Sequence, residues 1–280
     1  MRRGSGGSLV AFFLLTDALM WACFGTVAAA GIPTNSMLGF LLITLGVFAP
    51  SLVALALTAR TEGRSGVRSL LGRIMRGPVA ARWYVFAVAY IPAIKLAAAA
   101  IHRIATGAWP RFGDVPLYLI PLAILVSTPV QAGEEVGWRG YALPRMAERI
   151  GLAPASVLLG LLWAFWHLPQ FFIREADTYG QSFLVYVLQV TALSVAMAWL
   201  FAKAGGSLLP VMLMHAAVNN AKVIVPSATP GDSDPFGSSA SLVAWLTVTL
   251  LWVCAGAFLA RMPDVRISNR APGSPSRRLA

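Results

Sequence analysis

Long apolar blocks alternate with short polar segments along the whole chain. Eight of these blocks are close to the length of about 20 residues that a helix needs to span a bilayer. Their ranges are 9–30, 37–59, 83–101, 116–143, 153–173, 182–202, 207–224 and 239–260. The pattern predicts an all-α fold, a polytopic transmembrane helical bundle of about eight spans.

The first block follows a basic start and therefore resembles a signal peptide. Its apolar run, from Leu9 to Ala30, is longer than the core of a signal peptide. We therefore expect the first span to be retained, with cleavage as the alternative.

We expect the spans to form one transmembrane domain over residues 1–265, with its motif-bearing core at 115–225. Residues 266–280 are rich in Pro, Ser and Arg, which predicts a disordered basic tail. Loop 60–83 interleaves apolar and Arg residues at the spacing of a short amphipathic helix on the inner leaflet. A basic connector that only fixes topology explains this loop equally well.

Composition and charge agree with a membrane protein. The chain is 58% hydrophobic and only 12% charged, whereas a soluble domain has about 25% charged residues. The net charge of +11 falls mainly in the gaps between apolar blocks, so we expect the bilayer as a partner and no nucleic acid. With the N-terminus in the cytoplasm, 17 of the 22 Lys and Arg lie on that side and 4 on the other. This split predicts that both termini are cytoplasmic, and the short, Arg-rich loops favour the inner membrane of a bacterium.

Ionisable side chains inside the blocks are few, and each is a functional candidate because charge is costly in a bilayer. Asp17 and Lys95 could pair with each other and serve only packing. Glu135 and Arg139 are four residues apart on a helix, which predicts an ion pair. Glu134 points about 100° away from Glu135, so we expect it to be unpaired and free to act. The alternative is an ion cluster of all three at the cytoplasmic end of the helix.

Two histidines lie within blocks, each with a partner one helical turn away. His167 follows Trp163 by four residues and His215 precedes Asn219 by four, so each pair shares a helix face. Alone, either histidine would be an ordinary packing residue. With Glu134 and Asn219, the two histidines place an acid, two imidazoles and an amide on three spans.

This constellation depends on one structural condition. The fourth helix must continue past Arg139 toward Pro144 and Met146, which carries Glu134 about 18 Å from the inner end of the helix. If the helix stopped at Gly133, the acid would lie at the surface and the constellation would fail.

The same residues resemble three motifs of the CPBP family, the CAAX prenyl protease and bacteriocin-processing (Abi) group of intramembrane metalloproteases. The motifs are EExxxR, FxxxH and HxxxN, and the resemblance covers about residues 115–225. They are represented by Glu134, Glu135 and Arg139 in EEVGWR, by Trp163 and His167 in WAFWH, and by His215 and Asn219 in HAAVN. Trp163 stands where the family pattern has Phe.

The resemblance implies an intramembrane endopeptidase whose catalytic cavity opens toward the cytoplasmic side. Glu134 and His167 would activate a water molecule, and His215 and Asn219 would bind the oxyanion. The supporting residues would be Glu135, Arg139 and Trp163.

The family name also implies a metal. Glu134, His167 and His215 are possible Zn²⁺ ligands, and three such side chains with a water would complete a catalytic zinc site. A metal-free glutamate mechanism uses the same residues, and the sequence does not choose between the two.

The substrate is open at this stage, as is the oligomeric state. We expect a membrane-associated peptide or protein, either CAAX-type or bacteriocin-like. The alternative is a non-catalytic membrane protein that binds a peptide or partner in the same cavity, as an immunity or scaffold protein. A small transporter with a proton relay ranks last, because the sequence has no repeated halves or paired broken helices.

Overall fold

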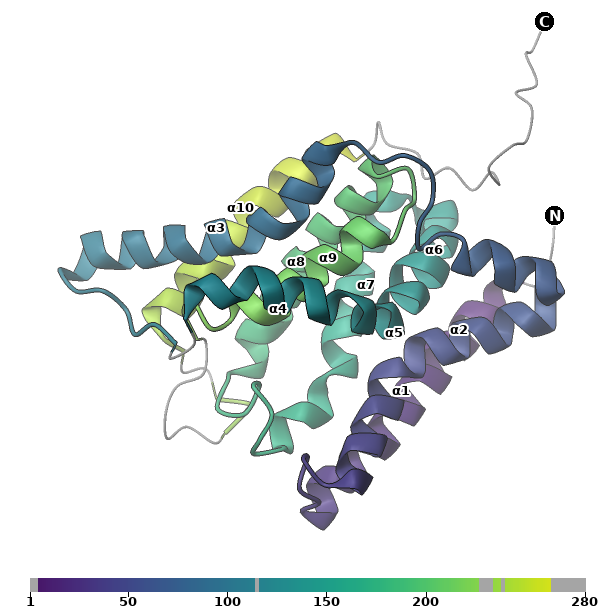
Figure 1. Ribbon diagram of the computed structural model, residues 1–280, viewed down its shortest axis with the longest axis horizontal. Coiled ribbons are helices and arrows are strands. Elements are labelled where there is room, and N and C mark those ends of the chain that lie inside the picture. Colours follow the sequence, from purple (N-terminus) through teal and green to yellow (C-terminus); the bar gives the residue numbers. More distant parts are fainter. Residues whose placement is uncertain (1–4, 114–115, 227–233, 238–239, 263–280) are drawn as a thin grey trace, which may run out of the picture.

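A computed structural model of the chain describes residues 5–113, 116–226, 234–237 and 240–262 (Figure 1). All regular structure in these residues is helical. The long helices are α1 (Ser5–Ala30), α2 (Met37–Leu71), α3 (Ala81–Thr106), α7 (Leu152–Trp166), α8 (Phe183–Lys203) and α10 (Leu242–Arg261). The proposed tail at 266–280 lies outside the described residues.

The fourth apolar block forms one continuous but irregular helical rod. Its successive pieces are η1 (Leu117–Leu119), α4 (Ile120–Ser127), η2 (Thr128–Gln131), α5 (Ala132–Glu135), η3 (Val136–Ala142) and α6 (Leu143–Ile150). The helix therefore continues past Pro144, and the condition on which the constellation depends is confirmed.

Seven helical segments of the described chain are long and apolar enough to cross a membrane. They are Ser8–Ala30, Met37–Leu71, Ala81–Thr106, Leu117–Ile150, Leu152–Phe172, Phe183–Lys203 and Leu242–Arg261. The molecule is a multi-pass helical bundle, as the hydropathy pattern predicts.

The eighth expected block, 207–224, is the exception. It forms α9 (Leu209–Ala221), which has only 13 residues and is shorter than the roughly 20 that span a bilayer. Apolar residues after Ala221 belong to a turn, which is why hydropathy alone overestimates this helix. Because α9 packs on α3, α4 and α8, its short length is accommodated inside the bundle.

The bundle has two flanks around a buried centre (Figure 1). α1 and α2 pack on each other on one flank, and α3 lies beside α10 on the other. Between them, α7 and α8 make the most extensive helix pair. Gly160 allows this close approach, because a Cβ there would lie 2.7 Å from the Cα of Thr191. The central helices α7, α8 and α9 carry or surround the candidate histidines.

The basic loop after the second span is partly helical. α2 continues to Leu71 beyond a kink at Gly63, whose φ of 65° is in the left-handed region that favours glycine. The helical part of the amphipathic prediction is therefore confirmed as far as Leu71. Its contact with the inner leaflet stays a prediction.

Two details of the charge analysis need correction. Asp17 and Lys95 do not pair: α1 packs on α2 and α7, whereas Lys95 on α3 donates to the backbone oxygen of Val225 at 3.0 Å. Arg139 is fully buried, so it does not belong to a surface charge count. The segment from Leu208 to Val223 still connects the two ends of the bundle, since Leu208 bonds to Arg73 and Val223 bonds to Gly113. With this segment counted as a crossing, the predicted split of Lys and Arg becomes 16 to 4 and favours the same orientation.

Candidate active site

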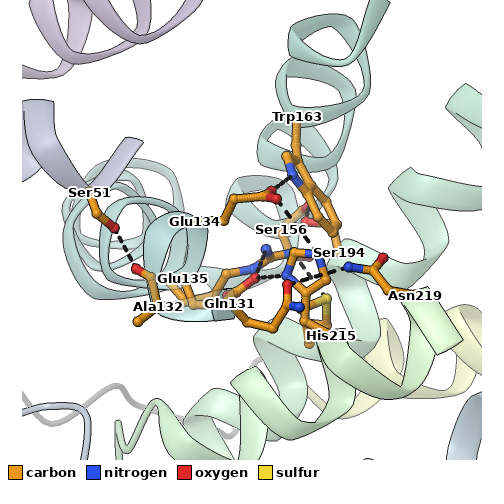
Figure 2. Close-up of polar contacts among 12 residues, drawn as sticks. Ser51, Gln131, Ala132, Glu134, Glu135, Ser156, Trp163, Ser194, His215 and Asn219 are labelled. Atoms are coloured by element: carbon orange, nitrogen blue, oxygen red, sulfur yellow. Dashed lines mark hydrogen bonds and ion pairs between the residues drawn. The ribbon is translucent and has the colours of Figure 1, made fainter. Parts of the chain in front are cut away.

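The segment that carries the two glutamates is held against α2. A Cβ on Gly137 would lie 2.5 Å from the carbonyl carbon of Pro50, so only glycine allows the two backbones to approach this closely. Ser51 also donates to the backbone oxygen of Ala132 at 2.6 Å (Figure 2). The chain then enters a π-helical turn, η3, whose seven residues are all buried. Such turns occur mostly inside α-helices and frequently at functional sites.

Burial excludes the alternative of an ion cluster at the cytoplasmic helix end. Glu134 is 6% exposed, and Glu135 and Arg139 are both 0% exposed. Arg139 Nη1 donates to Glu135 Oε1 at 2.9 Å, so the predicted i to i+4 ion pair is confirmed. A charge pair buried this deeply needs further partners to offset its desolvation.

Glu135 has a second partner that the helical spacing did not predict. Its Oε1 also lies 2.8 Å from Nδ1 of His215 on α9 (Figure 2). An ionised carboxylate only accepts hydrogen bonds, so Nδ1 of His215 carries the proton. Glu135 therefore connects Arg139 to His215 and sets the orientation of the imidazole.

Glu134 is also paired, which corrects the expectation that it is an unpaired acid. The indole Nε1 of Trp163 donates to Glu134 Oε2 at 2.8 Å. The other oxygen, Oε1, lies 3.9 Å from Nε2 of His215. One carboxylate oxygen is thus fixed by the indole, while the other faces the imidazole (Figure 2).

Trp163 lies between most of the other groups of the site. The guanidinium carbon of Arg139 is 4.3 Å from the centre of its ring, close enough for a cation–π contact. The rings of His215 and His167 approach it edge-on, at 5.3 and 5.5 Å between centroids. Arg139 Nη2 also contacts the sulfur of Met197 at 3.4 Å. The tryptophan therefore packs against the cation and both imidazoles while it holds the acid.

His167 is the C-cap of α7, and its orientation is also defined. Its Nδ1 lies 2.7 Å from the backbone oxygen of Trp163. A carbonyl oxygen can only accept, so Nδ1 carries the proton and Nε2 is left unprotonated in the neutral ring. No direct ion pair joins His167 and Glu134 in the part of the chain that the structure describes.

Asn219 lies at the edge of the site. Its side chain is exposed, and Nδ2 donates to Oε1 of Gln131 at a long 3.4 Å. The next residue, Asn220, donates to Oγ of Ser127 at 2.9 Å. The structure thus brings Glu134, His215 and the supporting residues into one network, with His167 adjoining and Asn219 at the rim.

Glu134, His167 and His215 are the possible zinc ligands. Both histidines use Nδ1 for a hydrogen bond and keep Nε2 for another partner, an arrangement common among metal-ligating histidines. However, no three His, Cys, Asp or Glu side chains of the described chain are grouped closely enough to hold a metal ion. Glu134, His167 and His215 are thus not close enough together in this conformation to share a metal ion, and zinc at these residues stays a prediction.

Several contacting residues escaped the sequence analysis. Gln131 gave a visible signal, as a polar side chain near the end of an apolar run. Met197 and Tyr186 gave none, because an apolar or aromatic residue on α8 does not differ from its neighbours in the sequence. Tyr186 is a neighbour of His167, with ring centroids 5.5 Å apart.

Comparison with known proteins supports the three motifs. The family model described as "Type II CAAX prenyl endopeptidase Rce1-like" matches residues 115–221, which include all three motifs. The chain is also 30% identical, over 92 residues, to CAAX prenyl protease 2 of Methanococcus maripaludis. That match covers 31% of this chain and 34% of the archaeal protein, about a third of each. Both findings confirm the resemblance to CPBP family proteases.

Proposed function

Starting from an Rce1-like segment at residues 115–221, we propose that the protein is an intramembrane endopeptidase that hydrolyses a peptide bond of a membrane-associated substrate. The observation that carries the proposal is the arrangement of Glu134. One of its oxygens is fixed by an indole N–H at 2.8 Å, and the other faces an imidazole at 3.9 Å. A carboxylate with only a packing role would not need its second oxygen directed at another polar group.

In the proposed reaction Glu134 is the general base. Its Oε1 takes a proton from a water molecule that Nε2 of His167 orients, and the resulting hydroxide attacks the scissile carbonyl. Glu134 then returns this proton to the leaving amine as the C–N bond breaks. Proton transfer of this kind contributes about 10²- to 10⁴-fold to a rate.

His215 and Asn219 would stabilise the oxyanion of the tetrahedral intermediate. Because Nδ1 of His215 donates to Glu135, the ring donates from Nε2 only when both nitrogens are protonated. Two carboxylates and one guanidinium surround the ring, and their net negative charge suits such a cation. Asn219 would exchange its long bond to Gln131 for one to the oxyanion.

The finer assignments are part of the same proposal. The substrate is CAAX-type or bacteriocin-like, and the chain lies in the cell membrane with both termini in the cytoplasm and the cavity open toward that side. The relative from Methanococcus maripaludis is named a CAAX prenyl protease, which supports the first substrate class.

In an alternative, metal-dependent form of the mechanism, Glu134, His167 and His215 would hold a zinc ion, which would require these side chains to move closer together than the structure shows. It is tested by metal analysis of the purified protein, wild type and His215→Ala. Stoichiometric zinc that is lost in the variant would establish the metal form, whereas metal-free protein with full activity would establish the glutamate form.

The function is tested with full-length protein in liposomes and a library of membrane-tethered peptides. Wild type is expected to cleave a subset of them, and Glu134→Ala and His167→Ala to lose this cleavage. Glu62→Gln is the control, since Glu62 is an exposed acid paired only with Arg145 at 2.6 Å in the described contacts. Binding of a peptide without cleavage by wild type would favour the non-catalytic alternative.

A further inference from the structure

A cavity of about 430 Å³ lies away from the candidate active site, at the end of the bundle where α3 begins and α8 ends. The connection from α2 to α3 forms one wall, and the turn after α8 forms the other. Its lining comprises Arg76, Arg82, Trp83 and Lys203, the segment 77–80 and the turn at 204–205. The lining contains three cations and no carboxylate.

Aromatic rings accompany two of the cations. The guanidinium carbon of Arg82 is 5.2 Å from the centre of the Trp83 ring. Nζ of Lys203 is 4.4 Å from the centre of the Trp199 ring. Cation–π contacts of this kind restrain flexible cationic side chains. The charges are therefore held near the cavity rather than dispersed over the surface.

The walls of the cavity are held together by backbone hydrogen bonds. Leu208 N donates to Arg73 O at 2.7 Å, and Leu209 N donates to Ile74 O at 3.0 Å. These two bonds fix the α2–α3 connection against the start of α9. The relative position of the two cationic segments thus belongs to the fold and does not require a ligand to create it.

Backbone is also accessible along the cavity. Gly77 and Gly205 have φ values of 62° and 64°, and a Cβ at either position would meet no atom within 4 Å. Both line the cavity, but the N–H of Gly205 already donates to the backbone oxygen of Ala202 at 3.1 Å. The backbone N–H of Gly77 is therefore the glycine donor that we assign to an anion between the cations. The apolar remainder, from Pro78 to Ala80 with Trp83, suits a lipid better than a fully hydrated ion.

The position of the cavity relative to the membrane also favours a lipid. α3 begins at Ala81 and α8 ends at Lys203, and both are candidate spans. The cavity therefore lies at the level of the lipid headgroups. Basic pockets between transmembrane helices on the cytoplasmic side bind anionic headgroups, and Trp is enriched at this level.

We propose that this cavity is a phosphate-binding site that takes the headgroup of an anionic phospholipid. Arg76, Arg82 and Lys203 provide the charge, and Trp83 and the Pro78–Ala80 segment contact the apolar part of the lipid. The site does not depend on the proposed protease activity.

The test uses full-length protein in nanodiscs or detergent and measures bound lipid by native mass spectrometry. The probe is dioleoylphosphatidylglycerol, with dioleoylphosphatidylcholine as the neutral lipid. Wild type is expected to retain the anionic lipid selectively. The triple variant Arg76→Gln, Arg82→Gln, Lys203→Gln is expected to bind it at least about tenfold more weakly, given the contribution of each basic residue near a membrane surface.

The matched control removes the same charge from a neighbouring surface. Arg60→Gln, Arg64→Gln, Arg68→Gln changes three exposed arginines of α2 that do not line the cavity. Its affinity for the lipid should stay within about twofold of wild type, because these arginines do not line the cavity and salt screens the attraction of exposed charges that do not contact the headgroup. An equal loss in both triple variants would show nonspecific attraction and overturn the proposal.

A cavity-filling variant and a competition with inorganic phosphate complete the test. Ala80→Trp fills the cavity without changing charge and should also weaken lipid retention, which covers the case that the charge variant does not fold. Inorganic phosphate at millimolar concentration should compete with the lipid if phosphate is the recognised group. Binding of inorganic phosphate without retention of the lipid would overturn the assignment to a headgroup.

Discussion

The indole of Trp163 on α7 holds the carboxylate of Glu134 on α5, with 2.8 Å between Nε1 and Oε2. The sequence pattern of the CPBP family has Phe at this position, and Phe cannot donate. In this chain the ring therefore does more than fill space beside His167. It fixes one oxygen of the proposed general base and directs the other toward the imidazole of His215.

Replacing Trp163 by Phe keeps a ring and removes only the donor. The carboxylate of Glu134 then loses its hydrogen bond from Trp163. A hydrogen bond to a charged group contributes about 1.5–3 kcal/mol. We expect kcat to fall by about tenfold or more with a small change in KM, because Glu134 loses its fixed position while the peptide contacts stay.

Trp166→Phe is the matched control for this substitution. Trp166 lies on the same helix against His167, and its buried Nε1 has no hydrogen-bond partner among the described residues. Removing the N–H of Trp166 should leave kcat and KM within about twofold of wild type, because no hydrogen bond is broken. Equal effects of the two variants would show that the Trp163 hydrogen bond has no specific role.

The buried pair of Glu135 and Arg139 should be essential for stability. Arg139→Ala leaves the carboxylate of Glu135 buried with only His215 as a partner, and breaking a buried pair costs about 3–5 kcal/mol. Denaturant unfolding in detergent measures this loss. Glu62→Ala removes the exposed partner of Arg145 and should cost less than about 1 kcal/mol. Similar losses in the two variants would contradict the buried role of Arg139.

Gly137→Ala should disturb the site without changing any polar group. The added methyl would lie 2.5 Å from the Pro50 carbonyl carbon, so α2 and the π-helical turn must separate. Overpacking of this kind costs about 1–3 kcal/mol, and activity should fall because Glu134 shifts with its segment.

Gly256→Ala on α10 tests whether this effect comes from the close contact. A Cβ at Gly256 meets no atom within 4 Å, so the substitution should be neutral or stabilising by up to about 1 kcal/mol through helix propensity. Thermal unfolding and peptide cleavage check both variants. Full activity of Gly137→Ala would show that the contact between the π-turn and α2 does not position Glu134.

Local geometry made part of this site predictable. The i to i+4 spacing correctly pairs Glu135 with Arg139, and the apolar blocks correctly give the long helices. The continuation of the fourth helix was a condition of the predicted site, and the structure meets it. These features depend on residues close in sequence. Hydropathy alone did not show that α9 would be only 13 residues long.

Contacts between helices could not be predicted from the sequence. The bond from His215 to Glu135 joins residues 80 positions apart, and that from Trp163 to Glu134 joins residues 29 apart. Helical periodicity gives the face of each helix but not the rotation of one helix against another. The pairing of Asp17 with Lys95 was wrong for this reason, since α1 and α3 pack on different neighbours.

The central claim is that Glu134 is the general base of a peptidase, and Glu134→Gln tests it most directly. Gln keeps the shape and can still accept from Trp163, but it cannot take a proton from water. Single-turnover cleavage of a membrane-tethered peptide should slow by about 10²- to 10⁴-fold at unchanged stability, while Glu62→Gln keeps the wild-type rate. Cleavage by Glu134→Gln at the wild-type rate would contradict the account.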